Sequence, residues 1–276
     1  MKKILIAFWA ICSAYGLHAQ NEGHNLFINA GGGIHQLKYQ LNNGTSKGGV
    51  GTILNAGYSY FFNNNWGVSA GIGLQTLKSE ATLNYMVKSP DSDTDGDTYE
   101  LRTNYKDWKE EQNAYTADIP IALNFKYDID SHVGLTTSIG GKFSIPFRTT
   151  YKATGGTITT TGYYSQWNVE FSDLPEQRFT TYANRPTGDI TLKPTFSFIA
   201  DIGATFKISK AIALYTGAYT SYGIISMLKN NAKPIYQKDG TYNGILSSYQ
   251  SNNLIPMTLG VKLGVVWNMI KPNHKR

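Results

Sequence analysis

The chain has 276 residues, a formal net charge of +6, 41% hydrophobic residues and only 16% charged residues, where about 25% is usual in soluble domains. After the first twenty residues no stretch is apolar enough to cross a membrane as a helix, and no basic run interleaved with aromatic residues points to nucleic acid. The 28 glycines and 19 tyrosines favour short strands and turns over helices.

Residues 1–19 are predicted to be a secretory signal peptide. Lys2 and Lys3 form a basic start, residues 4–14 an apolar centre, and Ala19 a small residue at the cleavage site. The alternative, an N-terminal membrane anchor, is disfavoured because the apolar run is short for a span. Cys12, the single cysteine, lies inside this segment, so the mature chain has no disulfide and no thiolate metal site.

Period-two alternation of apolar and polar residues predicts eight strands, because each strand then has one face in each environment. The seventh, within residues 211–226, is apolar on both faces and its facing stays open. The apolar faces of the other seven begin, in chain order, with Leu26, Leu54, Trp66, Ile119, Val133, Phe196 and Ile255.

The connections between these strands alternate in length. Residues 63–65, 128–132 and 209–210 are short, whereas residues 38–49, 88–113, 149–191 and 227–253 are long. Short turns on one side and long loops on the other are typical of outer-membrane barrels, in which an even strand count places both termini in the periplasm. The predicted fold is therefore all-β, an antiparallel up-and-down transmembrane barrel over residues 20–270 with a periplasmic tail at residues 271–276. A hairpin at residues 157–171 would allow ten strands.

A soluble β-sandwich or lipocalin-like barrel would show the same alternation with its apolar face turned inward. Two further features favour the membrane. The polar faces are rich in Gly, Ser and Thr, as a narrow lumen requires, and aromatic residues gather at the strand ends as in an interfacial girdle. The predicted girdle comprises Phe61, Phe62, Trp66, Tyr127 and Trp267.

With its signal peptide, eight alternating segments and last strand at residues 254–267, the mature chain resembles the small OmpA-like and OmpX-like outer-membrane barrels. This resemblance implies an outer-membrane location in a Gram-negative-type envelope. The chain departs from the pattern by continuing past Trp267 instead of ending on an aromatic residue. It also lacks the periplasmic peptidoglycan-binding domain of larger members, so anchoring to the cell wall is not implied.

One loop contains the sharpest local motif, in which four aspartates alternate with other residues around Gly96. This spacing resembles the start of a calcium loop, although the glutamate that would complete it is replaced by Arg102. The motif predicts either a calcium site or a solvated acidic loop tip. The ligands would be Asp91, Asp93, Asp95 and Asp97.

Six charged residues are predicted to face the lumen. An interior of eight strands is only wide enough for side chains, so these charges are expected to pair with one another. We expect Asp118 and Asp201 to be the partners of Lys142 and Lys262. The set is Asp118, Lys126, Lys142, Asp201, Lys207 and Lys262.

Three functions follow from these patterns. The first is a non-enzymatic envelope protein whose aromatic-rich loops bind an extracellular ligand or an envelope protein, or cap the barrel. The second is a small passive channel, which needs a wider lumen. The third is a hydrolase at the outer rim built on His35, for which no motif is present. Apart from the possible calcium ion no cofactor is predicted, and outer-membrane lipid is the expected surrounding.

Overall fold

The computed structural model describes residues 23–229, 233–237 and 240–269. The predicted signal peptide at residues 1–19 and the tail at residues 271–276 lie outside the described residues. No helix in the described ranges is long and apolar enough to cross a membrane.

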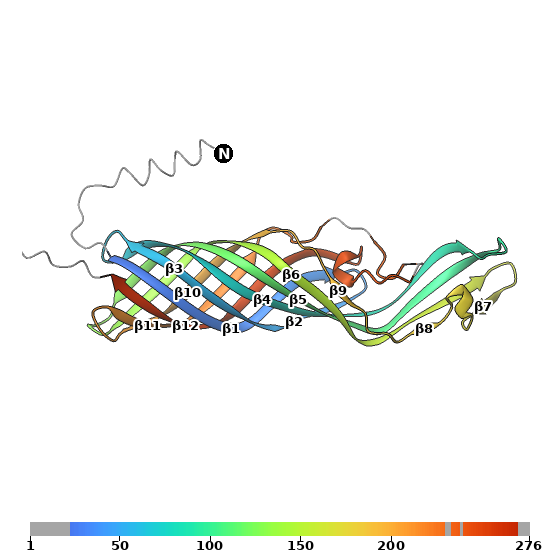
Figure 1. Cartoon of the computed structure of the whole chain (residues 1–276), viewed down its shortest axis with the longest axis horizontal. Helices are drawn as coiled ribbons and strands as arrows, with labels where there is room; N and C mark the ends of the chain where they lie inside the picture. Colours follow the sequence, from blue (N-terminus) through green and yellow to red (C-terminus); the bar gives the residue numbers. More distant parts are fainter. Residues whose placement is uncertain (1–22, 230–232, 238–239, 270–276) are drawn as a thin grey trace, which may run out of the picture.

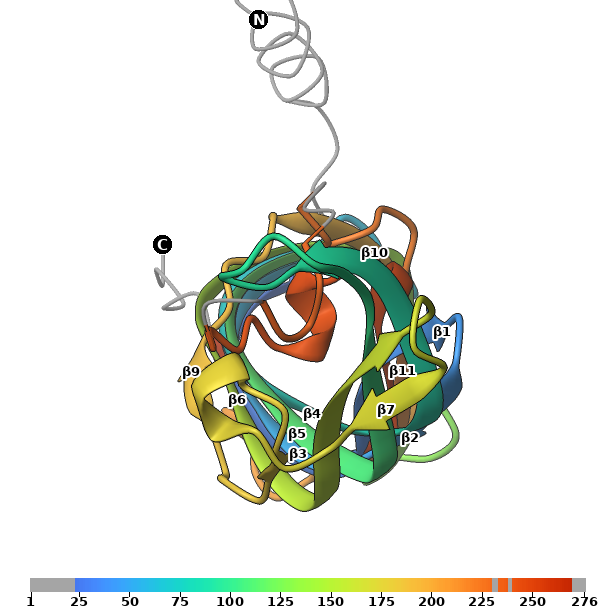
Figure 2. The ribbon, with the colours of Figure 1, turned by 90° about the vertical axis from the view of Figure 1, so that its right-hand side faces the viewer.

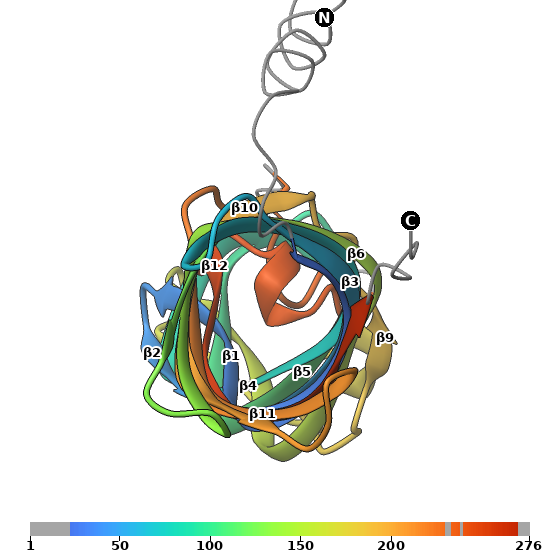
Figure 3. The same ribbon diagram turned by 90° about the vertical axis from the view of Figure 1, so that its left-hand side faces the viewer.

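Eight antiparallel strands form a closed ring, and the last strand pairs with the first (Figures 1 and 3). This confirms the predicted eight-stranded barrel and excludes ten strands in the ring. Closure leaves no unpaired backbone edge inside the membrane, where lipid offers no hydrogen bonds. The ring strands are β1 (Gly23–Leu41), β3 (Val50–Phe61), β4 (Trp66–Ser92), β5 (Thr98–Asp128), β6 (Val133–Tyr164), β10 (Thr195–Lys207), β11 (Ile212–Gly223) and β12 (Ser251–Met269).

Four shorter strands lie outside the ring. β2 (Gly44–Gly48) pairs with β4, and β7 (Val169–Phe171), β8 (Thr181–Tyr182) and β9 (Thr187–Asp189) pair with the outer part of β6. β6 and β7 form the hairpin expected within residues 157–171, although it projects from the barrel and does not join its wall. Two single-turn 3-10 helices complete the fold, η1 (Pro175–Gln177) and η2 (Ile245–Ser247).

The three short turns lie at one end of the barrel, together with both ends of the described ring (Figure 1). Side-chain caps close all three. Ser209 Oγ accepts the backbone N–H groups of Ala211 and Ile212 at 3.2 and 3.1 Å. Asn63 Oδ1 accepts those of Asn65 and Trp66 at 2.9 and 2.7 Å. Asp130 Oδ1 accepts those of His132 and Val133 at 2.6 and 2.8 Å. Asn and Asp favour such turns because their side chains satisfy the backbone two residues on.

Two predicted long loops, residues 88–113 and 149–191, are largely strand. In the second, β6 continues to Tyr164. β4 and β5 remain paired out to Ser92 and Thr98, far beyond the apolar segments that marked them in the sequence. The prediction ended these strands too early because it followed the apolar face that contacts lipid, and that face stops where the barrel leaves the membrane.

The alternation changes phase along the strands. In β4 the exposed apolar residues Ile72 (70% exposed) and Leu74 (54%) point outward, whereas Leu77 and Leu83, at 1% and 0%, point inward. In β1 the same change lies between Ile34 and Leu37. Apolar residues face lipid within the membrane, and they face the interior where the outside of the barrel is water. The exposed apolar band defines the membrane-spanning part of an outer-membrane barrel.

The predicted aromatic girdle at the short-turn end is present with one correction. Phe62, Trp66, Tyr127 and Trp267 are 38–56% exposed on the outer surface. Phe61 is 5% exposed and points into the lumen, because it is one residue out of phase with Phe62 on an extended strand.

An apolar core fills the outer half of the barrel. The connection from β11 to β12 places η2 inside the ring (Figures 2 and 3). Its described residues, 224–229, 233–237 and 240–250, are named here the inner loop. Met227, Ile235, Ile245 and Leu246 of this loop pack against inward-facing wall residues that include Leu37, Leu77, Trp108 and Tyr151. The loops predicted to cap the barrel therefore include one that closes it from the inside, and this apolar closure is named here the seal.

The phase change predicts that Ile72, in the lipid-facing part of β4, tolerates truncation far better than a charge. Ile72→Arg places a charge against lipid and is expected to lower the free energy of unfolding by about 2–4 kcal/mol in a bilayer. Ile72→Ala should cost far less. Urea unfolding of vesicle-inserted protein measures both, and equal, small effects of the two substitutions would contradict the lipid-facing assignment.

Candidate functional site: the lumen, its seal and the projecting arm

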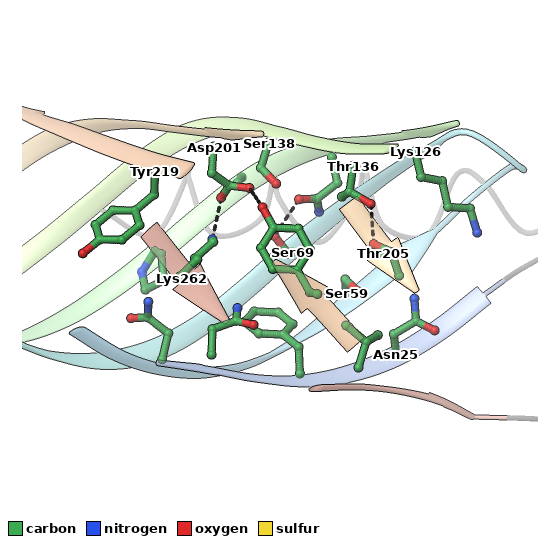
Figure 4. A pocket seen from close by; sticks show the side chains of 18 of the residues that line it. Asn25, Ser59, Ser69, Lys126, Thr136, Ser138, Asp201, Thr205, Tyr219 and Lys262 are labelled. Carbon is green, nitrogen blue, oxygen red and sulfur yellow. Dashed lines mark hydrogen bonds and ion pairs between the residues drawn. The ribbon is translucent and has the colours of Figure 1, made fainter. Parts of the chain in front are cut away.

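A polar cavity of about 380 Å³ occupies the half of the barrel nearer the short turns (Figure 4). Its lining reaches from the strand ends at Gly23 and Met269 to Tyr219 and Thr258, beneath the apolar core. The lining includes all six charges predicted to face the lumen: Asp118, Lys126, Lys142, Asp201, Lys207 and Lys262.

Two ion pairs lie along the inner wall of the barrel. Lys142 Nζ lies 3.0 Å from Asp118 Oδ2, and Lys262 Nζ lies 2.7 Å from Asp201 Oδ2. Tyr215 donates its hydroxyl to Asp201 Oδ1 at 2.9 Å, and Lys142 also donates to Gln75 Oε1. Each of these four charges thus has a partner of opposite sign, as the narrow lumen requires. These pairs link β5 to β6 and β10 to β12.

The remaining two lysines lie near the periplasmic mouth. Lys207 Nζ pairs with Asp128 Oδ2 at 2.9 Å, and Lys126 Nζ lies 4.4 Å above the ring centre of Phe61. Asp128 was not predicted to face the lumen, because its sequence position indicates a turn. The strict alternation of β5, which turns Lys126 and Asp128 to the same face, was the available signal.

Glycines give the lumen its room for aromatic side chains. A Cβ atom at Gly31 would lie 3.0 Å from the ring of Tyr219, and one at Gly260 would lie 2.8 Å from its hydroxyl. Tyr219 therefore lies across two glycines of neighbouring strands, which explains glycine at these inward-facing positions.

His35 lies inside the barrel and not at its outer rim. It is fully buried, with Nε2 hydrogen-bonded to the Tyr219 hydroxyl and Nδ1 lying 3.1 Å from the carbonyl oxygen of Thr76. No loop carboxylate contacts it in the described part of the chain. The hypothesis of a rim hydrolase required His35 to lie among loop residues. Because the His35 side chain points inward from β1, it does not lie there.

Glu110 holds the inner loop in place. This fully buried carboxylate accepts the backbone N–H of Ile245 at 3.0 Å, the hydroxyl of Tyr242 at 2.5 Å and an N–H of Gln112 at 2.9 Å. Tyr242 in turn accepts the indole N–H of Trp108 at 2.8 Å. The seal thus contains one polar network inside an apolar core, connecting β5 to the inner loop.

Burial raises the pKa of Glu110 to about 7, because desolvation outweighs its three hydrogen bonds. Burial also raises the pKa of Tyr39 and of Tyr242, so both neighbouring phenols stay neutral at physiological pH. Glu110 was not predicted as a site residue, because its only signal in the sequence is a carboxylate in the inward phase of an extended β5.

The aspartates of residues 91–97 do not converge on a common point. Asp93 caps its own turn, accepting the N–H groups of Asp95 and Asp97 at 3.0 and 2.9 Å, and its other oxygen accepts the hydroxyl of Tyr164 at 3.0 Å. Within the described residues no three His, Cys, Asp or Glu side chains gather as metal ligands. The structure therefore gives Asp93 a role in the turn and does not assemble the four-aspartate calcium site.

A β-structured arm projects beyond the barrel (Figure 1). It consists of residues 84–106 and 156–182, and it begins at a bulge where Asp107 and Gly156 adopt φ angles of 49° and 76°. Asn84 and Asp107 hydrogen-bond to each other across this bulge at 2.7 and 3.0 Å. Because a bulge bends the strand that contains it, this point directs the arm away from the barrel.

The end of the arm has its own small aromatic core. The ring of Tyr99 stacks on Tyr164 at 5.2 Å and meets Phe179 edge-on at 5.2 Å, and all three are buried. Trp167 and Phe171 pack against Tyr164 at ring-centre distances of 5.1 and 5.5 Å. They remain 54% and 37% exposed, and the neighbouring Val169 is 40% exposed. The arm therefore presents apolar and aromatic side chains on an ordered β support.

No protein-family model and no curated protein matches this sequence. Among solved structures it is similar to the attachment invasion locus protein Ail of Yersinia pestis, solved with the heparin analogue sucrose octasulfate (13% identity, TM-score 0.31, 91% of this chain and 100% of that chain). It is also similar to Neisserial surface protein A (9%, 0.37, 91% and 100%) and to the outer membrane protein OprG from Pseudomonas aeruginosa (8%, 0.41, 91% and 98%). At these identities the likeness extends to the barrel and to no individual residue or ligand.

Breaking one lumen pair should destabilise the barrel strongly. Asp118→Asn leaves Lys142 buried without a counter-charge and is expected to cost about 3–5 kcal/mol of unfolding free energy. The double variant Asp118→Asn, Lys142→Met should recover most of that loss. Urea unfolding in vesicles gives both values; a double variant as unstable as the single one would contradict the pairing.

The seal should weaken as pH rises. Because the folded state raises the pKa of Glu110 from 4.5 to about 7, the unfolded chain releases this proton first. The contribution of Glu110 to the free energy of unfolding is therefore fully present below pH 4.5. It is expected to fall by about 3 kcal/mol as pH rises through 7. Glu110→Gln should flatten this dependence, measured as the unfolding midpoint against pH. An unchanged slope in the variant would assign the dependence to other groups.

Proposed function

We propose that this protein is a non-enzymatic surface-binding protein, in which a sealed outer-membrane barrel holds an ordered arm outside the cell. The observation that carries this proposal is the arm itself. Its strands are the outer parts of β4, β5 and β6, which remain paired on both sides of the bulge, so the barrel wall and the bulge together fix its direction.

The exposed side chains at the end of the arm are of the kind that make effective contact surfaces. Aromatic rings such as Trp167 and Phe171 contribute large contact areas with few rotatable bonds to immobilise. Arg102 adds a polar element, since its guanidinium pairs with Glu170 at 2.7 Å and lies 4.2 Å above the ring centre of Tyr163. An extracellular protein or glycan surface is the partner that this combination favours.

The sealed lumen disfavours the channel alternative. A conduction path through the barrel would have to cross the apolar core, where Leu37, Leu77 and Ile245 are each no more than 1% exposed. The polar cavity ends beneath this core. We therefore expect no stable conductance in planar bilayers, and discrete open steps of the wild-type protein at neutral pH would favour the channel.

Adhesion of whole cells tests the binding role. Cells displaying the wild-type protein are expected to adhere to at least one of a panel of immobilised extracellular-matrix proteins and sulfated glycans. Trp167→Ala, Phe171→Ala should reduce that adhesion about tenfold, because aromatic anchors carry most of a contact surface's energy.

The matched control removes two exposed apolar side chains elsewhere. Ile72→Ala, Val261→Ala truncates residues of the lipid-facing band and should leave adhesion unchanged. The heat-induced mobility shift on a gel verifies that each variant is folded. No adhesion to any coated surface, or an equal loss in the control, would contradict the proposal.

A further inference from the structure

The charges that line the lumen cavity do not cancel. Among the described residues, four lysines and three aspartates line it. Three of these lysines form the ion pairs with aspartate described above. Lys126 has no carboxylate partner within the described part of the chain, and its ammonium lies 4.4 Å from the ring centre of Phe61. The cavity therefore contains one cation without a counter-charge, an arrangement that enclosed surroundings penalise.

Several hydrogen-bonding groups of the same lining also lack partners. Asn124 Nδ2 and Asn29 Oδ1 are buried and have no hydrogen-bond partner within the described residues. Further lining side chains form no hydrogen bond to another described residue (Figure 4): those of Asn25, Asn55, Ser59 and Ser138. Because buried polar groups are normally hydrogen-bonded, a set of unpartnered groups around one cavity indicates a polar occupant.

Aromatic rings lie against the wall of this cavity. A Cβ atom at Gly57 would lie 2.6 Å from Cζ of Phe27, and one at Gly67 would lie 2.8 Å from Cγ of Phe61. Each ring therefore covers a glycine of a neighbouring strand, and its other face borders the cavity that it lines. The face of an aromatic ring carries partial negative charge, so it attracts C–H groups that adjacent hydroxyl groups have polarised.

We propose that the cavity binds a small sugar acid, a monosaccharide with one carboxylate and several hydroxyl groups. The carboxylate pairs with Lys126, the hydroxyls bond to the unpartnered amides and hydroxyls of the wall, and the C–H face packs on the rings of Phe27 and Phe61. The volume of about 380 Å³ is within the range of small-molecule sites. Water leaves Lys126 without a counter-charge, and a simple anion leaves the ring faces unused.

The structure gives this ligand one direction of access. The lining of the cavity reaches the strand ends at Gly23 and Met269, whereas the seal covers its other end. The sugar acid therefore enters and leaves from the periplasm, and the cavity is a binding site and not a path to the outside. The inference concerns the lumen and does not require the arm to bind any ligand.

Nuclear magnetic resonance of the isotope-labelled, full mature protein in micelles tests the site, with D-glucuronate as the probe. Glucuronate is expected to cause saturable shifts of the backbone amide signals of Ser59, Lys126 and Thr136, which line the cavity. D-glucose keeps the hydroxyls without the carboxylate, and acetate keeps the carboxylate without the hydroxyls. Both are expected to bind at least tenfold more weakly than glucuronate.

Two variants separate the parts of the site. Lys126→Gln should weaken glucuronate binding about tenfold or more, because it removes the charged partner of the carboxylate. It leaves no other charge without a partner, so the barrel should still fold. Phe27→Leu should weaken glucuronate binding about threefold through the lost ring face. Lys210→Gln is the matched control, since it removes an exposed lysine at the same end that does not line the cavity, and it should keep the wild-type affinity.

Four outcomes would overturn the site. These are no saturable shift in the wild type, unchanged affinity in Lys126→Gln, an equal loss in Lys210→Gln, and acetate binding as tight as that of glucuronate. A response of Trp167 with none at Lys126 would place the sugar on the arm and would likewise overturn the lumen site. The heat-induced gel shift establishes folding of all variants.

Discussion

The bilayer's lack of hydrogen-bonding groups is the constraint on which the rest of this structure depends. It requires every backbone N–H and C=O in the membrane to be paired, and the eight-stranded closed ring satisfies that requirement. An eight-stranded ring leaves an interior of side-chain dimensions, so inward charges must meet one another. The pairs Lys142–Asp118 and Lys262–Asp201 are the result.

The same strands serve two solvents in succession. Within the membrane their outer face is apolar and their inner face polar; beyond it the two faces exchange chemistry, as Leu74 and Leu77 show on β4. The exchange turns the outer half of the barrel into a conventional apolar core that closes over the polar cavity. The lipid-facing band, the wall around the seal and the arm are consequently consecutive parts of one continuous sheet.

Polar groups inside the apolar core are concentrated where the inner loop must be held. Glu110 accepts the N–H of Ile245 and the hydroxyl of Tyr242. These bonds fix to the wall a loop whose described residues form no strand. The arm achieves order differently, through the rings of Tyr99, Tyr164 and Phe179. Both devices stabilise regions that extend beyond the ladder hydrogen bonds of the ring.

The sequence by itself determined the strand count, the short turns and the six inward charges, because period-two alternation is a local property that survives in the residue order. It also determined that Asp118 and Asp201 would need cationic partners. Only the tertiary structure placed His35 beside Tyr219, turned Phe61 inward, brought Glu110 to the inner loop and left the four aspartates apart. Those outcomes depend on which distant strands face one another across the lumen and on where the surroundings change from lipid to water. Local periodicity contains neither the contacts between distant strands nor the position of that change.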